Sequence, residues 1–384
     1  MPDEVPFLLD VTRLVWRRWR GRNPTGIDRV CLAYLRRFAG RSQAVVNHER
    51  FRRILDRQAS LELFALLEEP TPDFRRRLMA GTLRHLGRFN GKGKGRLYLN
   101  VGHTGLNSPG FRSWVQEADV RPIYLVHDLI PITHPQFCRA GEARKHRERM
   151  RTVLTSGAGI IGNSRTTLDD ISVFAANEHL EVPATLAAWL GADPLPAPDR
   201  LSPSQRPTFV TLGTIEARKN HLLLLEIWSR LVGSLGNQAP RLLVIGQRGW
   251  EAEHVFRLLD GKGLKGHVLE LNHSTDQELA NHLASARALL FPSFAEGYGL
   301  PLIEALTAGT PVIASDLRVF REIGAEIPAY LSPSDAAGWE AAILDYARVD
   351  SAERAAQLKR MKSFRKPDWS THFDRVEAWL GEFD

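Results

Sequence analysis

Two glutamates, eight positions apart, flank a glycine-rich turn in the stretch FAEGYGLPLIEALTAGTPVIAS, residues 294–315. Glu296 precedes the turn, and Glu304 lies in a run whose apolar spacing predicts a helix. A carboxylate placed beside a helix start can accept hydrogen bonds from vicinal hydroxyls, such as those of a ribose. The alternative is a strand, a turn and a helix whose charges face solvent. The turn itself favours a ligand site.

This turn offers backbone N–H groups to an anion. They belong to Gly297, Tyr298, Gly299 and Leu300, directly ahead of the predicted helix. Pro301 suits the first helical turn, where its missing N–H costs nothing. Because exposed N–H groups and the helix dipole both attract negative charge, the turn predicts a phosphate cradle. We interpret the flanking glutamates as hydroxyl clamps and not as an acid/base pair.

A pair of cations follows another predicted strand, in the loop GTIEARKN, residues 213–220. Gly213 permits close backbone approach, and Arg218 and Lys219 add two positive charges at the carboxyl end of the strand. A planar guanidinium and a compact ammonium together suit a diphosphate. The alternative is a surface loop, but cations at a helix N-terminus oppose the helix dipole. We therefore favour a ligand role.

The sequence has no Asp-x-Asp motif that would hold Mg²⁺. The nearest approach, Glu117-Ala118-Asp119, lies in a polar segment and not at a strand end. A site without such carboxylates needs protein cations to stabilise a leaving diphosphate. We therefore expect no metal and no other cofactor.

Strand-like runs alternate with helical runs in both halves of the chain. A proline-rich segment, residues 191–207 with five prolines, separates the two sets. Alternation of this kind predicts an α/β protein with two parallel, doubly wound sheets, whose ligands bind beyond the carboxyl ends of the strands. The expected first set comprises strands 7–14, 44–49, 96–103, 120–128 and 157–164, with a helix at 25–39. The expected second set comprises strands 207–214, 241–246, 267–271, 288–293 and 311–315.

Composition bounds the class of protein. The chain has 384 residues, 43% of them hydrophobic and 25% charged, which is typical of globular domains. Its two cysteines, Cys31 and Cys138, are far apart, and no run of 18 apolar residues occurs. The sequence begins without the basic-then-apolar order of a signal peptide. We expect a disulfide-free protein of the cytoplasm.

Positive charge gathers in the first part of the chain. Residues 1–150 contain 28 Lys and Arg against 15 Asp and Glu, a net charge of +13, and the remainder has a net charge of −6. The excess lies in three clusters that also contain aromatic residues: 17–22, 49–57 and 74–96. Such clusters bind an anionic membrane surface or nucleic acid, or simply form a solvated face. Trp16, Trp19 and Phe74 favour the membrane interface.

Together, EGYGLPLIEALTAGTPVIASD and LGTIEARKN resemble the C-terminal domain of family 4 of the retaining glycosyltransferases. The resemblance implies the GT-B fold, in which two Rossmann-like domains face each other across a cleft and a C-terminal helix crosses back to the first. The expected parts are an acceptor-binding domain, a linker, a nucleotide-sugar domain and the returning helix. Their expected bounds are residues 1–190, 191–206, 207–366 and 367–384.

The family's E-x7-E motif maps onto Glu296 and Glu304, and its basic pair maps onto Arg218 and Lys219. By this resemblance, Glu304 holds the ribose of the donor. Glu296 and the Gly297–Leu300 backbone contact the donor sugar and phosphate. The two cations neutralise the departing nucleoside diphosphate.

The first domain carries weaker signals. His127 ends the strand-like YLVHD, and similar histidines lie near the donor sugar in the family, although a core histidine bonded to backbone is the alternative. Asp128 is expected to orient a neighbour, and His103 is a weaker candidate at another strand end. Gly26 lies at the family's glycine-rich position after the first strand, where most members have two glycines. This chain departs from that pattern, because it has the single Gly26 after Pro24 and Thr25.

The expected reaction is metal-independent transfer of a hexose from a nucleoside diphosphate sugar, with retention, to an acceptor hydroxyl. HDLIPITHP, residues 127–135, resembles a stretch of bacterial polysaccharide mannosyl- and rhamnosyltransferases, which favours GDP-mannose. The expected acceptor is a growing surface glycan or a lipid-linked saccharide, reached through peripheral contact with the anionic inner membrane, and no nucleic acid is expected. Two alternatives stay open: a GT-B sugar-nucleotide epimerase, and a non-enzymatic binder that uses the basic first domain.

Overall fold

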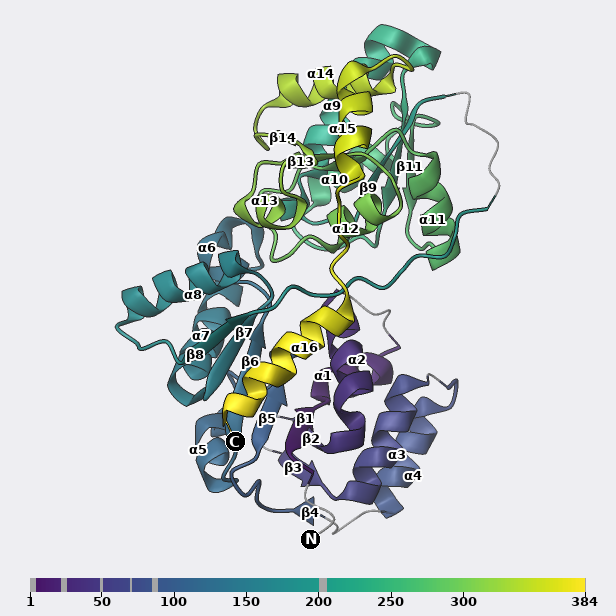
Figure 1. The fold of residues 1–384 in the computed structure, drawn as a ribbon. Coiled ribbons are helices and arrows are strands. Elements are labelled where there is room, and N and C mark those ends of the chain that lie inside the picture. The colour runs from purple at the N-terminus through teal and green to yellow at the C-terminus, as the bar shows by residue number, and fades with distance from the viewer. Residues whose placement is uncertain are drawn as a thin grey trace. The chain divides into compact units, whose positions relative to one another are not determined.

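The computed structural model describes residues 5–21, 26–48, 51–69, 71–84, 89–199 and 206–383. Within these ranges the chain forms two compact units, each with its own sheet (Figure 1). Unit 1 contains the chain up to Leu129, Arg144–Leu190 and the C-terminal segment from Trp369. Unit 2 contains Ile130–Ala143 and Gly191–Asp368. The expected first domain, residues 1–190, is therefore interrupted by a short segment that groups with unit 2.

Unit 1 has an eight-stranded sheet in the order β4-β3-β2-β1-β5-β6-β7-β8. The pairs from β2 to β8 are parallel, whereas β3 is antiparallel to both β2 and β4. The predicted parallel sheet is thus correct for the centre, and an antiparallel edge was missed. The strands are β1 Phe7–Asp10, β2 Ser42–His48, β3 Phe51–Leu55, β4 Phe89–Asn90, β5 Leu97–Asn100, β6 Arg121–Val126, β7 Gly159–Gly162 and β8 Ala184–Ala187.

The first predicted strand, residues 7–14, is wrong at its end. The strand stops at Asp10, whose Oδ1 accepts a hydrogen bond from the Thr12 N–H at 3.0 Å, and a helix begins at Thr12. The helices of unit 1 are α1 Thr12–Trp19, α2 Gly26–Phe38, α3 Arg57–Glu68, α4 Phe74–Arg84, α5 Phe111–Glu117, α7 Glu142–Ser156, α8 Arg165–Glu178 and α16 Trp369–Leu380. The helix expected at 25–39 corresponds to α2.

The C-terminal helix α16 packs on unit 1, as Figure 1 shows in yellow. The ring of Phe373 lies 5.1 Å from that of Tyr34, and the Tyr34 hydroxyl lies 3.0 Å from His372 Nε2. Trp379 is also buried, and β7 makes room for it at Gly159, where a Cβ would come within 2.5 Å of the indole. The helix therefore docks through its aromatic side chains.

Unit 2 has a six-stranded sheet, wholly parallel, in the order β11-β10-β9-β12-β13-β14. Its strands are β9 Thr208–Leu212, β10 Arg241–Ile245, β11 Val268–Leu271, β12 Leu289–Phe291, β13 Val312–Ser315 and β14 Ala329–Leu331. Its helices are α6 Ile130–Thr133, α9 His221–Leu235, α10 Glu253–Asp260, α11 Asp276–Ser285, α12 Leu300–Thr307, α13 Arg318–Gly324, α14 Ala336–Ala347 and α15 Ala352–Met361. The core contains fully buried Trp228 and Trp339, as expected between a parallel sheet and its covering helices.

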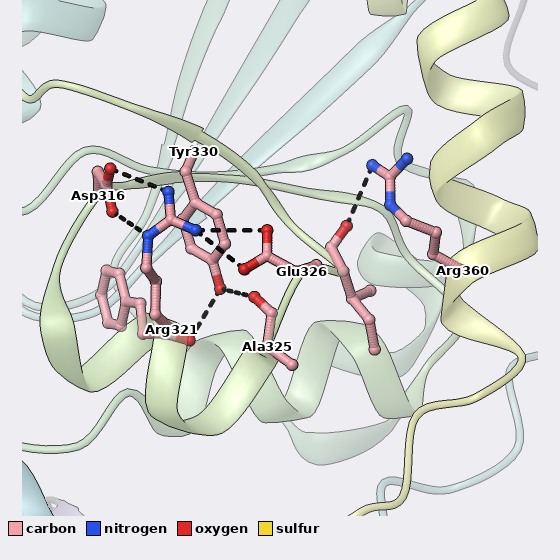
Figure 2. Close-up of polar contacts among 8 residues, drawn as sticks. Asp316, Arg321, Ala325, Glu326, Tyr330 and Arg360 are labelled. Atoms are coloured by element: carbon pink, nitrogen blue, oxygen red, sulfur yellow. Dashed lines mark hydrogen bonds and ion pairs between the residues drawn. The ribbon is translucent and has the colours of Figure 1, made fainter.

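A polar cluster fixes α13, which the sequence pattern did not predict (Figure 2). Arg321 pairs with Asp316 through two hydrogen bonds of 2.5 and 3.0 Å, and its guanidinium lies 4.5 Å from the centre of the Tyr330 ring. The Tyr330 hydroxyl lies within 2.9 Å of the carbonyl oxygens of Phe320 and Ala325. The cluster therefore fixes Phe320, whose ring lies against Gly299 of the glycine-rich turn.

Candidate functional site

The glycine-rich turn connects β12 to α12 and leaves the helix N-terminus open. Gly299 is the N-cap residue, with φ of +114°, and it has no side chain to cap the helix. A Cβ there would lie 2.9 Å from Phe320 Cε1, so the position has both the conformation and the space of a glycine. Pro301 lies in the first turn, as predicted. Pro301 has no N–H and the Leu302 N–H donates to the Gly299 carbonyl at 3.0 Å, so the predicted anion cradle depends on the N–H groups of the turn up to Leu300.

The loop after β9 buries Lys219 and leaves Arg218 only partly exposed, unlike a surface loop whose cations face solvent. Lys219 is buried, with 7% of its side chain exposed, and its ammonium lies 4.7 Å from the centre of the Phe291 ring. Gly213 has φ of +124°, and a Cβ there would come within 3.3 Å of Lys219 Cε and Nζ. The Lys219 side chain therefore lies over Gly213, which is a specific reason for glycine at this position.

Glu296 joins the two predicted motifs in one ion cluster. Its Oε1 lies 2.5 Å from Lys219 Nζ, and its Oε2 lies 2.8 Å from Arg218 Nη1. Ser293 donates a third hydrogen bond to Glu296 Oε1 at 2.8 Å. The backbone joins the same loops, because Phe294 N–H donates to the Arg218 carbonyl at 2.8 Å. Two segments about eighty positions apart in the sequence thus form one charged site at the carboxyl edge of the sheet.

Burial and charge set the ionisation of this cluster. Burial alone would raise the pKa of Glu296, but Arg218 and Lys219 outweigh it and lower the pKa to about 2. Burial lowers the pKa of Lys219, and the Glu296 carboxylate opposes that effect. Each group keeps its charge because the other is present. The cluster is therefore a set of mutually dependent charges.

Two residues of this region were missed by sequence reasoning. Glu216 is 4% exposed, and its Oε1 lies 2.7 Å from Arg218 Nη2. His221, the first residue of α9, is 2% exposed, and among the described residues neither of its ring nitrogens has a hydrogen-bond partner. Burial, followed by the nearby Lys219, lowers the pKa of His221 to about 3. A glutamate two positions before the basic pair was the available signal for Glu216.

The second glutamate of the motif, Glu304, lies in α12 and is half-buried. It is five residues into the helix when Leu300 is counted as the first, one turn beyond the N-terminus. The structure thus places it on the helix that begins at the glycine-rich turn, with Glu296 before that turn. The helix predicted around Glu304 is therefore correct, and the ribose role stays a prediction.

One segment from the first half of the sequence lies in unit 2. Residues 130–143 include α6 and a short helical turn, Pro135–Phe137. The Phe137 ring stacks on that of Phe294 at 4.8 Å and 9°, and Arg139 lies 4.9 Å from the Trp250 ring centre. Phe294 is two residues from Glu296, so this segment borders the charged cluster. The sequence analysis did not anticipate this contact.

The expected residues of unit 1 lie in a different setting. His127 is 5% exposed, and its Nε2 lies 2.8 Å from the Val101 carbonyl oxygen, so this nitrogen donates and Nδ1 carries the lone pair. Burial lowers the pKa of His127 to about 4. The rings of His103 and His127 lie 5.1 Å apart, and that of His146 lies 5.9 Å from His103. The backbone hydrogen bond agrees with the alternative of a core histidine, and a catalytic role stays a prediction.

Backbone contacts hold this histidine cluster at the carboxyl ends of β5 and β6. Asn163 Nδ2 donates to the His127 carbonyl at 2.8 Å, and His146 Nε2 lies 3.0 Å from the Asp128 carbonyl. Gly26, the remaining candidate, is exposed at the start of α2, and residues 22–25 before it lie outside the described ranges. The phosphate contact at Gly26 stays a prediction.

Glu117, Ala118 and Asp119, the nearest approach to a metal-binding motif in the sequence, lie at the end of α5 and in the turn after it. Asp119 lies in a turn after α5 with φ of +52°. Across the described ranges, no group of three or more His, Cys, Asp or Glu side chains is arranged to hold a metal ion. Likewise, within those ranges no helix has the length and apolar character to cross a membrane.

Known proteins similar to part of this chain include glycosyltransferases. Residues 197–347 match the family model described as glycosyl transferases group 1. The chain is 31% identical over 234 residues to the serotype-specific mannosyltransferase WbdA of Escherichia coli, and 30% identical over 158 residues to the O-antigen chain mannosyltransferase B of the same organism. The first match covers 56% of this chain and 28% of the relative, and the second covers 41% of each.

The fold has counterparts among solved structures. The crystal structure of Anabaena Alr3699/HepE in complex with UDP-glucose superposes with a TM-score of 0.68 and 14% identity, covering 98% of this chain and 99% of that one. At this identity the likeness shows the fold alone. The chain therefore has the fold of two parallel-sheet α/β domains that these structures share, which confirms the fold predicted from the sequence, and residues 197–347 match a glycosyltransferase domain.

Proposed function

We propose that this protein transfers a hexose from a nucleoside diphosphate sugar to an acceptor hydroxyl. The observation that carries the proposal is the buried cluster in which Arg218 and Lys219 meet Glu296 beside the open N-terminus of α12. A departing nucleoside diphosphate develops negative charge at its phosphates. Fixed cations and helix N–H groups stabilise such charge without reorganising, which is how most electrostatic catalysis operates.

Each group has a distinct part in the proposed reaction. Arg218 and Lys219 stabilise the leaving diphosphate, and Glu304 accepts hydrogen bonds from the ribose hydroxyls. Glu296 holds the two cations and contacts the donor sugar. His127 accepts one hydrogen bond from a sugar hydroxyl at Nδ1, because its Nε2 donates to the Val101 carbonyl. The acceptor hydroxyl attacks from the face that the diphosphate leaves, so the anomeric configuration is retained.

We infer that the reaction needs no metal, because two protein cations supply the charge that Mg²⁺ would otherwise provide. Turnover should persist in EDTA. The control is a second assay to which Mg²⁺ or Mn²⁺ is added back. Strict dependence on an added divalent ion would contradict this part of the proposal.

We propose GDP-mannose as the donor and a surface glycan or lipid-linked saccharide as the acceptor. The names of the two Escherichia coli relatives, a serotype-specific and an O-antigen chain mannosyltransferase, support this choice. A thermal-shift panel with GDP, UDP, ADP and dTDP tests it, because a ligand that prefers the native state raises the melting temperature. GDP should give the largest shift. A larger shift with another nucleotide would replace the donor, and no shift with any of them would reject nucleotide-sugar transfer.

We further propose that unit 1 contacts an anionic membrane surface through α4. The helix has the sequence FRRRLMAGTLR, with four arginines and no acidic residue. Met79 is 51% exposed and Leu83, one turn later, is 69% exposed, so apolar side chains lie among the arginines on an exposed face. Phe74, expected to be an anchor, is instead buried at 6% exposure. Trp19, on neighbouring α1, is half-buried with the Arg75 guanidinium 5.6 Å from its ring centre.

Vesicle binding tests this membrane proposal. The protein should sediment with vesicles of phosphatidylglycerol and phosphatidylethanolamine, and less so as salt increases. Leu83→Glu should reduce binding severalfold, whereas Leu344→Glu, at an exposed apolar position of α14, should not. Equal binding of both variants would remove α4 from the interface.

A further inference from the structure

The buried carboxylate of Glu216 lies outside the roles assigned above. It follows β9 in the loop that precedes Arg218, and its side chain is 4% exposed. A carboxylate this deeply buried is stable only when it is paired and hydrogen-bonded. Its Oε1 lies 2.7 Å from Arg218 Nη2, so it is paired with one of the two cations of the proposed donor site.

The backbone around Glu216 is fixed from two sides. Ile215 N–H donates to the Gln247 carbonyl at 2.9 Å, and Gly249 N–H donates to the Ile215 carbonyl at 3.0 Å. A Cβ at Gly249 would lie 2.7 Å from Thr214 Cγ2, so the two loops approach more closely than a side chain would allow. Lys219 N–H then donates to the Glu216 carbonyl at 3.0 Å. The carboxylate therefore projects from a rigid support.

The guanidinium of Arg218 lies between two carboxylates and one carbonyl. Its Nη2 contacts Glu216, and its Nη1 contacts Glu296 Oε2 at 2.8 Å and the Ala295 carbonyl oxygen at 3.0 Å. A planar guanidinium held at both nitrogens keeps one orientation. Ala295 and Glu296 belong to the loop that leads into the glycine-rich turn. The orientation of Arg218 is therefore fixed relative to that turn.

The four charged groups of the cluster also balance one another. Glu216 and Glu296 supply two negative charges, and Arg218 and Lys219 supply two positive charges, linked in one chain of ion pairs. Burial raises the pKa of Glu216, and Arg218 and Lys219 oppose that effect. Without Glu216 the cluster would have a net charge of +1 in a buried setting. Such a site would bind a nucleoside diphosphate more tightly and release it more slowly.

We propose that Glu216 is a positioning residue of the donor site, which orients the Arg218 guanidinium and cancels one positive charge so that the nucleoside diphosphate can leave after transfer. This inference rests on the proposed function. It assigns Glu216 no contact with the substrate and no proton transfer. Its two effects, orientation and charge, can be separated by two substitutions.

Glu216→Gln keeps a hydrogen-bond acceptor for Arg218 and removes the charge. The dissociation constant of GDP, measured by calorimetry, should fall by roughly 3- to 10-fold, and kcat should fall as product release slows. Glu216→Ala removes the acceptor as well, so Arg218 loses its fixed orientation and kcat/KM should fall by at least about 10-fold. The matched control is Glu226→Gln, an exposed glutamate on α9, which should leave both constants unchanged.

The pH profile gives a readout that a purely structural role would not move. Lys219 is faced by Glu216, Glu296, Arg218 and His221. The Glu216 carboxylate raises the pKa of Lys219, so its removal lowers that pKa further. In Glu216→Gln, the high-pH limb of kcat/KM should therefore shift to lower pH.

Three outcomes separate the possibilities. Tighter GDP binding together with the shifted limb in folded Glu216→Gln supports the proposal, and thermal unfolding checks the fold. If the wild-type protein binds GDP, and Glu216→Gln has the same affinity and the same pH profile, the role of Glu216 is wrong while the proposed function stands. If the wild-type protein binds none of GDP, UDP, ADP and dTDP, both proposals are overturned.

Discussion

In both units polar side chains cluster at the carboxyl ends of the parallel strands, but different interactions fix them: ion pairs in unit 2 and hydrogen bonds to the backbone in unit 1. In unit 2 the cluster is charged, and Glu296 closes it through ion pairs with Arg218 and Lys219. In unit 1 the cluster is formed by histidines, and burial lowers the pKa of His103 and of His127, whose Nε2 bonds to the backbone of Val101. The charged cluster suits a ligand that brings phosphate charge. The neutral cluster suits hydrogen bonding to hydroxyls, where a fixed charge would add little.

The difference also affects how each region depends on its neighbours. Each charge of unit 2 requires an opposite charge beside it, because an uncompensated buried charge is very costly. His103 and His127 of unit 1 require only that they stay unprotonated, because burial lowers the pKa of both. We therefore expect removal of one member to affect catalysis most in unit 2, and a fall in pH to affect stability first in unit 1.

The largest expected effect is that of Lys219→Ala. Because the ammonium is buried and lies against Glu296, its loss removes a fixed stabiliser of the leaving diphosphate. We expect kcat to fall by roughly 10²–10³-fold, as for other single electrostatic stabilisers. Steady-state kinetics measures it, and Lys262→Ala, at an exposed position, is the control. Wild-type kcat in Lys219→Ala would remove this residue from the site.

The next effect tests the neutral cluster through pH. His127 has a pKa of about 4 when folded, against an ordinary value of 6.5. The unfolded chain therefore binds a proton first, and the folded state loses stability as pH falls from 6.5 towards 4. His127→Gln removes this titration. Between pH 6.5 and pH 4, the free energy of unfolding of the wild type should therefore fall by about 3 kcal/mol more than that of the variant.

Chemical denaturation at pH 7 and pH 4 measures this difference, with exposed His273→Gln as the control. Glu296, whose pKa is about 2, contributes stability that is present above pH 4.5 and is lost as pH falls below it. The two clusters should therefore fail in different pH windows. Equal loss of stability in His127→Gln and the wild type would contradict the contrast.

Glu304→Ala tests whether unit 2 binds the ribose and the phosphates of the donor through different residues. If the carboxylate holds ribose hydroxyls, its loss should weaken GDP binding by roughly 10- to 100-fold, the value of one or two charge-assisted hydrogen bonds. Inorganic pyrophosphate has no ribose, so its affinity should stay the same. Calorimetry with both ligands makes the test. A matching loss for pyrophosphate would assign Glu304 to the phosphates instead.

The smallest expected effect is that of Gly213→Ala. The residue has φ of +124°, and the new Cβ would lie 3.3 Å from Lys219 Cε and Nζ. We expect a loss of about 1–2 kcal/mol in stability from backbone strain, with weaker pyrophosphate binding because Lys219 must move. Gly233→Ala in α9, where a Cβ meets open space, should instead be neutral or slightly stabilising. Stabilisation by Gly213→Ala would show that the position does not require glycine.

The sequence was most informative where a motif is short and local. The alternation of strands and helices predicted both sheets, because burial on both faces makes parallel strands continuous apolar runs. Elements without such a signal were missed: β8 has no strong apolar run, and α13 is fixed by the contacts of Arg321, Asp316 and Tyr330. The start of α1 was missed because the residues after Asp10 are as apolar as a strand.

By itself, the sequence determined two alternating sets of strands and helices, the two Glu residues around a glycine-rich turn, and the basic pair after a strand, because these depend on residue type and spacing along the chain. Only the tertiary structure decided that Glu296 reaches Arg218 and Lys219, and that Glu216 supports Arg218 from the other side. It also decided that residues 130–143 group with unit 2. The reason is physical: spacing along a chain fixes which strand end a residue occupies, whereas a buried charge is fixed by partners that the sheet brings together from distant segments.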